Sequence, residues 1–142
     1  LKQYQKKTGF FIDRKPSRVK AKEIVEKLEI KTPGINHPIK NLSGGNIQKV
    51  LLGRELDSNP ELLITAYPVR GLDINTCYKI YDLLNQEKKK GVAILYIGED
   101  LDALIELSDR IMVINSGEIM GIVNASETTK EEIGLMMLGE KK

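Results

Sequence analysis

A serine followed by two glycines and an amphipathic run is the part of this sequence best suited to chemistry. The residues are Ser43, Gly44 and Gly45, within the segment 42–49. A serine suits the N-terminal cap of a helix, and glycines let backbone N–H groups approach an anion without a Cβ in the way. The first N–H groups of a helix are unpaired and lie at the positive end of its dipole. The segment therefore predicts a phosphate-binding loop.

A simpler interpretation is a glycine-containing loop that only caps a helix. The three residues alone would favour this interpretation, because serine and glycine are both common at helix starts. The full segment, Leu-Ser-Gly-Gly-Asn-Ile-Gln-Lys, is more specific, and further motifs follow it at suitable spacing. These additions favour the phosphate-binding interpretation.

The helix that would carry this loop is predicted at about residues 45–57. Its buried side is expected to hold three apolar residues and its exposed side three charged ones: Val50, Leu51 and Leu56, and Lys49, Arg54 and Glu55. An earlier helix is predicted from a cap at Ser17 to about Leu28. No strand is predicted in the first 57 residues.

Strands alternate with helices after Pro60. Short apolar runs predict buried strands at 62–66 and 92–97, and two more strands at 110–114 and 119–123, joined by a tight turn. Helices are predicted at 74–90, at 100–108 and from a capping box at Thr129 and Glu132 to about Leu138. The alternation predicts an α/β fold with a mainly parallel sheet.

Several other functions find no support in the composition. The formal net charge is +2 and the basic residues are scattered among acidic ones, which argues against nucleic-acid binding. Cys77 is the only cysteine and His37 the only histidine, so both are interpreted as structural. No G-x-G-x-x-G follows a strand, which excludes a dinucleotide-binding oxidoreductase.

The sequence shows no membrane-spanning or secretory segment. Its longest apolar stretch, around residues 92–97, is too short to cross a bilayer. The chain begins at Leu1 rather than at a methionine, so we expect it to be a piece of a longer protein, with an exposed sheet edge.

The segment 42–49 resembles the signature loop of ATP-binding cassette (ABC) ATPases. Its form is similar to the "LSGGNQQK" typical of simple-sugar and nucleoside importers, with Ile47 in place of the first glutamine. Residues 68–73 resemble the family's P-T-R-G-L-D loop, with Val69 in place of threonine, and residues 107–114 and 132–139 resemble its closing segments. The resemblance covers nearly the whole chain and is most specific over residues 40–139.

This resemblance implies the later part of a RecA-like P-loop NTPase. Residues 1–57 would form the helical subdomain with the signature, and residues 58–142 the C-terminal half of the ATPase core. The pattern described next implies the second of two cassettes. The phosphate-cradling motif G-x-x-x-x-G-K-[ST] does not occur in this chain.

The resemblance also implies that the chain's own catalytic site is degenerate. The family's Walker B pair, Asp-Glu, holds Mg²⁺ and polarises water, but Ala66 and Tyr67 stand at these positions. Glu99 stands at the position of the switch histidine, where a carboxylate would repel a γ-phosphate. This combination is common in the second, C-terminal half of nucleoside-importer ATPases. A simpler interpretation of Glu99 is a solvated acid at the start of a helix. Asp100 and Asp102 are expected to serve the start of a helix.

In the family, the signature loop closes over ATP held by a partner cassette. The resemblance therefore implies that five residues contact ATP in trans: Ser43, Gly44, Gly45, Asn46 and Gln48. The D-loop residues Gly71, Leu72 and Asp73 would lie at the interface. ATP and Mg²⁺ would be bound in the assembled parent, neither of them tightly by this chain alone, and we predict no catalytic or metal-binding residue within it.

The implied parent is a transport ATPase at the cytoplasmic face of the membrane, with a second cassette and transmembrane permease subunits as partners. Nucleosides are the implied solutes, with simple sugars next, and the isolated chain is expected to be inactive. The alternative is a non-catalytic regulatory or interaction module derived from a cassette. It explains the missing catalytic groups equally well but gives no physical reason to retain the signature.

Overall fold

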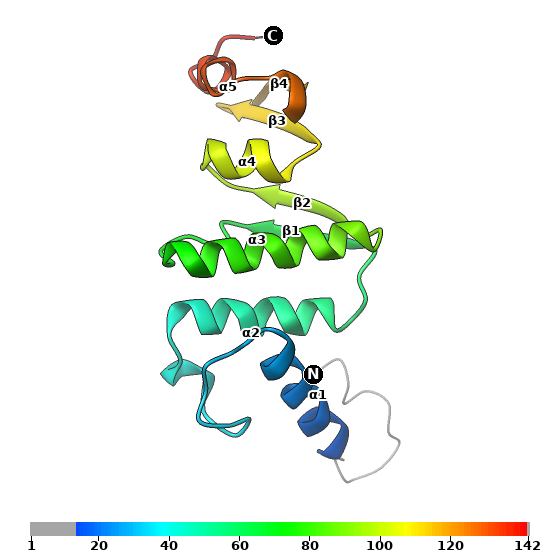
Figure 1. Ribbon diagram of the computed structural model, residues 1–142. Coiled ribbons are helices and arrows are strands. Elements are labelled where there is room, and N and C mark those ends of the chain that lie inside the picture. The colour runs from blue at the N-terminus through cyan, green and yellow to red at the C-terminus, as the bar shows by residue number, and fades with distance from the viewer. Residues whose placement is uncertain (1–13, 142) are drawn as a thin grey trace. The chain divides into compact units, whose positions relative to one another are not determined.

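The computed structural model describes residues 14–141, which fall into two compact units (Figure 1). The first unit holds the described residues 14–60 and 71–77, and the second holds residues 61–70 and 78–141. Residues 1–13 of the predicted helical subdomain lie outside the described residues. The sequence-based division between residues 57 and 58 stays a prediction.

The first unit contains two α-helices, α1 (Lys15–Lys27) and α2 (Gly44–Leu56), with the short 3-10 helix η2 (Ile39–Asn41) just before α2. Helix α1 starts after Arg14 and has Pro16 in its first turn, where a missing N–H removes no helical hydrogen bond. The prediction that Ser17 caps α1 is wrong, because Ser17 lies inside the helix. Proline in the first turn marks the start better than the serine that follows it.

A buried glycine lets α1 and α2 pack closely. A Cβ at Gly53 would lie 2.6 Å from Ile24 Cγ2 and 2.7 Å from Leu28 Cδ1, so the two helices meet where α2 has no side chain. An ion pair between Lys20 Nζ and Asp57 Oδ1, 2.8 Å long, joins the same two segments. The hydrogen bond to Asp57 raises the pKa of Lys20.

The predicted faces of α2 are right at some positions and wrong at others. Leu56 is buried and Arg54 exposed, as expected, but Lys49 is only 8% exposed and Leu51 is 41% exposed. The Lys49 ammonium group donates to the carbonyl of Glu29 at 3.3 Å. A lysine can bury its aliphatic stem while its charged end finds a carbonyl, and hydrophobic periodicity does not reveal this.

The second unit begins with a parallel strand pair, β1 (Leu62–Ala66) and β2 (Ala93–Ile97), which confirms both predicted strands. Helix α3 (Ile74–Lys89) connects them and is followed by Gly91 at φ +93. Leu63 and Thr65 of β1 are buried, whereas the alternate residues on the other face are exposed: Leu62, Ile64, Leu95 and Ile97. The expectation of fully buried strands is therefore wrong, because one face of this pair is open among the described residues.

The strands β3 (Arg110–Asn115) and β4 (Glu118–Asn124) form an antiparallel hairpin. Ser116 and Gly117 have φ values of +50 and +83, the two positive angles that a type I′ turn requires. The described strands thus form two two-stranded sheets, one parallel and one antiparallel. The expectation of a mainly parallel sheet is correct for the first pair only.

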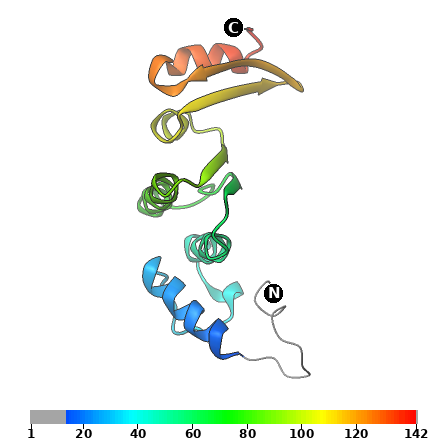
Figure 2. The same cartoon turned by 90° about the vertical axis from the view of Figure 1, so that its right-hand side faces the viewer.

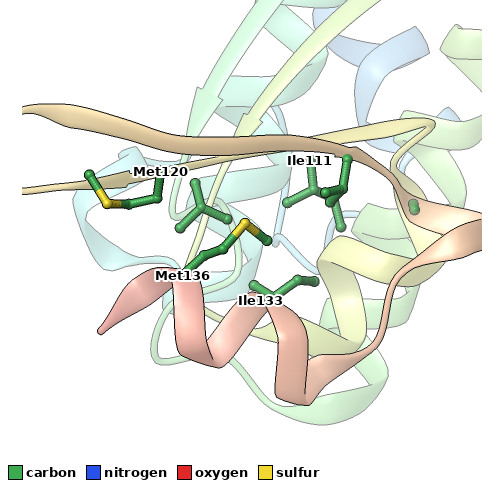
Figure 3. Packing of buried hydrophobic residues seen from close by; sticks show 7 residues of the cluster. Ile111, Met120, Ile133 and Met136 are labelled. Atoms are coloured by element: carbon green, nitrogen blue, oxygen red, sulfur yellow. The ribbon is translucent and has the colours of Figure 1, made fainter. Parts of the chain in front are cut away.

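One hydrophobic core cluster of the second unit lies between this hairpin and α5 (Lys130–Met137). Ile111 and Met120 of the hairpin face Ile133 and Met136 of α5 (Figure 3). Helix α5 runs along the hairpin (Figure 2), and the partly buried apolar residues of α4 (Leu101–Leu107) pack against the same cluster. This cluster fixes the closing elements of the chain.

Helix α5 has clear signals at both ends. The hydroxyl of Thr129 accepts the N–H of Glu132 at 3.2 Å, as predicted for a capping box, but the Glu132 carboxylate accepts from Thr128 instead. At the other end Gly139, at φ +105, donates to Met136 and closes a Schellman motif. Lys130 pairs with Asp102, which raises the pKa of Lys130.

No helix among residues 14–141 is both long and apolar enough to span a membrane.

Candidate functional site

The candidate site is built on the N-terminus of α2. Ser43 occupies the N-cap position with extended backbone, at φ −65 and ψ 156, and its carbonyl accepts the N–H of Ile47 at 2.9 Å. The expected side-chain cap is absent, because the Ser43 hydroxyl accepts no backbone N–H. It accepts instead from the side-chain amide of Asn46, at 2.8 Å between Nδ2 and Oγ. The serine is exposed, so its oxygen is held from one side and open to solvent on the other.

Backbone N–H groups at the start of α2 are available to a ligand. Within residues 14–141, the N–H groups of Gly44 and Gly45 donate to no protein acceptor. They lie at the positive end of a helix of 13 residues. Unpaired donors beside an exposed serine hydroxyl are a set that fits an anionic oxygen.

Asn46 links the loop to the chain that precedes it. Its Oδ1 accepts the backbone N–H of Lys31 at 2.9 Å, while its Nδ2 donates to Ser43. Both ends of the Asn46 amide are therefore used inside the first unit. Gln48, in the next turn, is half-buried, and its side chain makes no hydrogen bond within the described part of the chain.

The predicted D-loop lies beside the signature loop in the first unit. A Cβ on Gly44 would lie 3.6 Å from Leu72 Cδ2, and one on Gly45 would lie 2.8 Å from Thr76 Cγ2. Gly45 therefore has a packing requirement of its own, in addition to any ligand. Gly71 has φ +74, a conformation that favours glycine, and is exposed.

Asp73 is held by the start of α3. Its Oδ1 accepts the N–H of Thr76 at 3.0 Å, and its Oδ2 accepts the Thr76 hydroxyl at 2.7 Å. These bonds favour the charged form and lower the pKa of Asp73, with the hydroxyl as the larger cause. The carboxylate is thus an ionised, exposed group on the same unit as the signature loop.

The two predicted Walker B positions, Ala66 and Tyr67, lie at the end of β1. Ala66 is the last residue of the strand, and Tyr67 follows with a positive φ of +50, which is uncommon for a bulky residue. The N–H of Tyr67 donates to the carbonyl of Ile97 at 2.8 Å, which extends the pairing of the parallel strands by one residue. The Arg70 guanidinium lies 5.7 Å from the centre of the Tyr67 ring, a distance suited to a cation–π contact.

The switch position lies at the end of β2. Glu99 is exposed, two residues beyond Ile97. The next residue, Asp100, caps α4 by accepting the N–H groups of Asp102 and Ala103 at 3.1 and 3.3 Å. Asp102 lies in the first turn of α4. The prediction that Asp100 and Asp102 serve a helix start is confirmed.

The residues at these strand ends do not fit a magnesium site. Ala66 has no ligand atom, and Tyr67 offers only a phenol, whereas Mg²⁺ prefers carboxylate oxygens and water. Within residues 14–141 no three His, Cys, Asp or Glu side chains gather closely enough to hold a metal ion. Any metal-dependent step therefore needs ligands beyond these positions.

Two residues that hold the candidate site in place were not identified from the sequence: Thr76, which bonds Asp73, and Lys31, which bonds Asn46. Thr76 stands three residues after Asp73, and this Asp-x-x-Thr spacing is a readable capping signal. Lys31 contributes through its backbone N–H, for which the sequence carries no signal.

The chain is similar to ATP-binding proteins of bacterial importers. It is 41% identical over 129 residues to the nucleoside import ATP-binding protein NupA of Lactococcus lactis subsp. cremoris, covering 91% of this chain and 26% of that protein. It is 42% identical over 139 residues to the ribose import ATP-binding protein RbsA of Clostridium perfringens, covering 98% of this chain and 28% of that protein. The chain thus spans about a quarter of the length of these relatives. No protein-family model matches it.

The fold is similar to that of solved ABC cassettes. The dimeric post-hydrolysis structure of the cassette MJ0796, bound to ADP and Pi, matches with a TM-score of 0.70 and 25% identity, over 85% of this chain and 52% of that one. The chain belongs to the ABC family. Its fold is part of the family's RecA-like cassette, as the sequence predicted. The motifs at Ser43, Ala66, Asp73 and Glu99 can therefore be considered as parts of a cassette.

Proposed function

We propose that this ABC chain supplies its signature loop to ATP held by a partner cassette, within an import ATPase. Ser43 would donate its hydroxyl, and Gly45 its backbone N–H, to the γ-phosphate across the interface. Gly44, Asn46 and Gln48 would complete the loop, and Asp73 would lie where the two cassettes meet. Such contacts form only with ATP, so they couple closure of the pair to the nucleotide state.

The observation that carries this proposal is the state of the donors at the start of α2. The N–H groups of Gly44 and Gly45 are unpaired within the described chain, and the Ser43 hydroxyl is exposed. A helix cap with a purely structural role would use the serine oxygen for a backbone N–H, and Ser43 does not. These donors suit an anion that comes from outside the chain.

The chain's own catalytic positions support an asymmetric assembly. Ala66 and Tyr67 provide neither a metal ligand set nor a base suited to water near neutral pH. Glu99 places a carboxylate at the position that the resemblance assigns to the switch histidine. The site built on this cassette would therefore hydrolyse ATP poorly or never, while the partner's site would turn over. ATP and Mg²⁺ would be bound in the assembled protein, and the 142-residue chain alone would be inactive.

The relatives support a proposal for the transported solute, the partners and the location. NupA is a nucleoside import protein and RbsA a ribose import protein. We infer a nucleoside or a simple sugar as the solute, transmembrane permease subunits and a second cassette as partners, and the cytoplasmic face of the membrane as the location. The partner cassette would belong to the same polypeptide or to a homologous subunit, with this chain in the second of the two cassettes.

A regulatory or interaction module derived from a cassette is the second candidate. The absence of carboxylates at Ala66 and Tyr67 favours it, since a module that does not hydrolyse ATP has no need of them. The two candidates differ in the signature loop, because only the first gives Ser43 a ligand.

The substitution Ser43→Arg, made in the full ATPase subunit and assayed with its permease, tests the proposal. We expect ATP turnover to be abolished, since a long side chain would fill the position of the phosphate. Asn41→Ala is the matched control, because Asn41 precedes the loop and its side chain makes no hydrogen bond within residues 14–141. Near-normal turnover in Ser43→Arg would refute the in-trans role and favour the module.

A further inference from the structure

We infer that Asn46 is a positioning residue, which turns the hydroxyl hydrogen of Ser43 toward the partner's phosphate. Asn46 would thus act through Ser43 rather than by touching ATP itself. This inference rests on the proposed function and adds a residue role to the same loop.

The hydrogen-bond partners of Asn46 fix the orientation of its amide. The backbone N–H of Lys31 can only donate, so the atom of Asn46 that faces it at 2.9 Å must be the acceptor Oδ1. The opposite atom of the amide is then Nδ2, which lies 2.8 Å from Ser43 Oγ. If the amide were flipped, the NH₂ group of Asn46 would face the N–H of Lys31, and two donors would oppose each other.

The same reasoning fixes the role of the Ser43 hydroxyl. An amide NH₂ can only donate, so Ser43 Oγ must accept from Asn46. The hydroxyl hydrogen therefore points away from Asn46, and none of the described residues accepts it. An exposed serine ordinarily rotates among several partners, whereas here one side is occupied and the donor is left for an external acceptor.

Asparagine is the residue type that this geometry requires. An aspartate could still accept from Lys31, but it would also accept from Ser43 and draw the hydroxyl hydrogen inward. Its negative charge would in addition oppose an anionic phosphate. An alanine would remove both bonds and leave the hydroxyl free to rotate.

The experiment measures steady-state ATP turnover of the full transport ATPase with Asn46→Ala, Asn46→Asp, Ser43→Ala and the double variant Ser43→Ala/Asn46→Ala. We expect Asn46→Ala to lower turnover about tenfold, the factor expected when one hydrogen bond to the reacting group is lost. Asn46→Asp, which keeps the tie to Lys31, should lower it at least as far. In the Ser43→Ala background, Asn46→Ala should change turnover less than about twofold, because there is no hydroxyl left to orient.

The results separate this inference from the function on which it rests. Normal turnover in Ser43→Ala would overturn the proposed function. A loss in Ser43→Ala combined with an additive loss in the double variant would overturn the positioning role alone. Near-normal turnover in Asn46→Asp beside a loss in Asn46→Ala would also overturn it, because the bond to Lys31 would then be the part that matters.

Discussion

The contact between α1 and α2 predicts opposite effects for the same substitution at two helical glycines. A methyl group at Gly53 would lie 2.6 Å from Ile24 Cγ2 and 2.7 Å from Leu28 Cδ1. At Gly134, in α5, a Cβ would meet no atom within 4 Å. Gly53→Ala is therefore expected to destabilise the chain, and Gly134→Ala to stabilise it.

The magnitude follows from two opposing effects. Replacing glycine by alanine within a helix gains about 0.5–1 kcal/mol at either position. Overpacking at Gly53 costs about 1–3 kcal/mol, because carbon atoms of α1 must move from well inside their contact distance. The free energy of unfolding should fall by about 0–2.5 kcal/mol in Gly53→Ala and rise by about 0.5–1 kcal/mol in Gly134→Ala. The gap between the two variants equals the overpacking cost itself.

Native-state hydrogen exchange suits this comparison, because it reports each helix separately. Protection of the α2 amides should fall in Gly53→Ala, and protection of the α5 amides should rise in Gly134→Ala. Gly53→Ala should cost less in a Leu28→Ala background than in the native chain, because the Cδ1 atom that the new methyl group meets is then absent. Increased α2 protection in Gly53→Ala would refute the reasoning, because it would mean that the new methyl group meets no resistance from α1.

Three further predictions concern the two loops and the strand end. Thr76→Val should move the pKa of Asp73 back up toward its ordinary value of 3.8, measured by NMR titration, and an unchanged pKa would contradict the assignment. Because the native pKa is lowered, the stability that this bond contributes is present above pH 3.8 and is lost as the pH falls through the lowered pKa. Gly45→Ala should lower the unfolding temperature, because the new Cβ would lie 2.8 Å from Thr76 Cγ2. The double variant Gly45→Ala/Thr76→Ser should regain most of the lost unfolding temperature, because serine lacks Cγ2 but keeps the hydroxyl that bonds Asp73, and no regain would exclude a clash with Cγ2. If the proposed function holds, Tyr67→Glu should leave the ATP turnover of the full ATPase unchanged, because Ala66 still offers magnesium no ligand. Doubled turnover would count against a degenerate site.

Local signals allowed much of the fold to be predicted. Strand β1 was predicted residue for residue, and the tight turn of the hairpin and the cap at Thr129 were predicted from a few residues whose conformational preferences are strong. The capping role of Asp100 was predictable for the same reason. Signals of this kind depend mainly on a few neighbouring residues. They fail where another contact competes, as at Ser43.

The errors occurred where distant contacts decide. Lys49 is buried because a carbonyl of Glu29, 20 residues earlier, receives its ammonium group. Ser43 does not cap its helix because Asn46 occupies its oxygen, and the orientation of Asn46 depends on the N–H of Lys31. The signature motif located the candidate site, but hydrogen bonds between segments determine which atoms of the loop are left for a ligand.

The assignment of residues 71–77 to the first unit affects how this protein can be dissected. The chain on both sides of that segment belongs to the second unit, so it passes between the units at three places and no single cut separates them. A fragment ending at residue 60 would keep Gly44 and Gly45 but lose Leu72 and Thr76, against which they lie. A signature helix transplanted into another cassette should therefore bring residues 71–77 with it, or the recipient must supply equivalent side chains at those two positions.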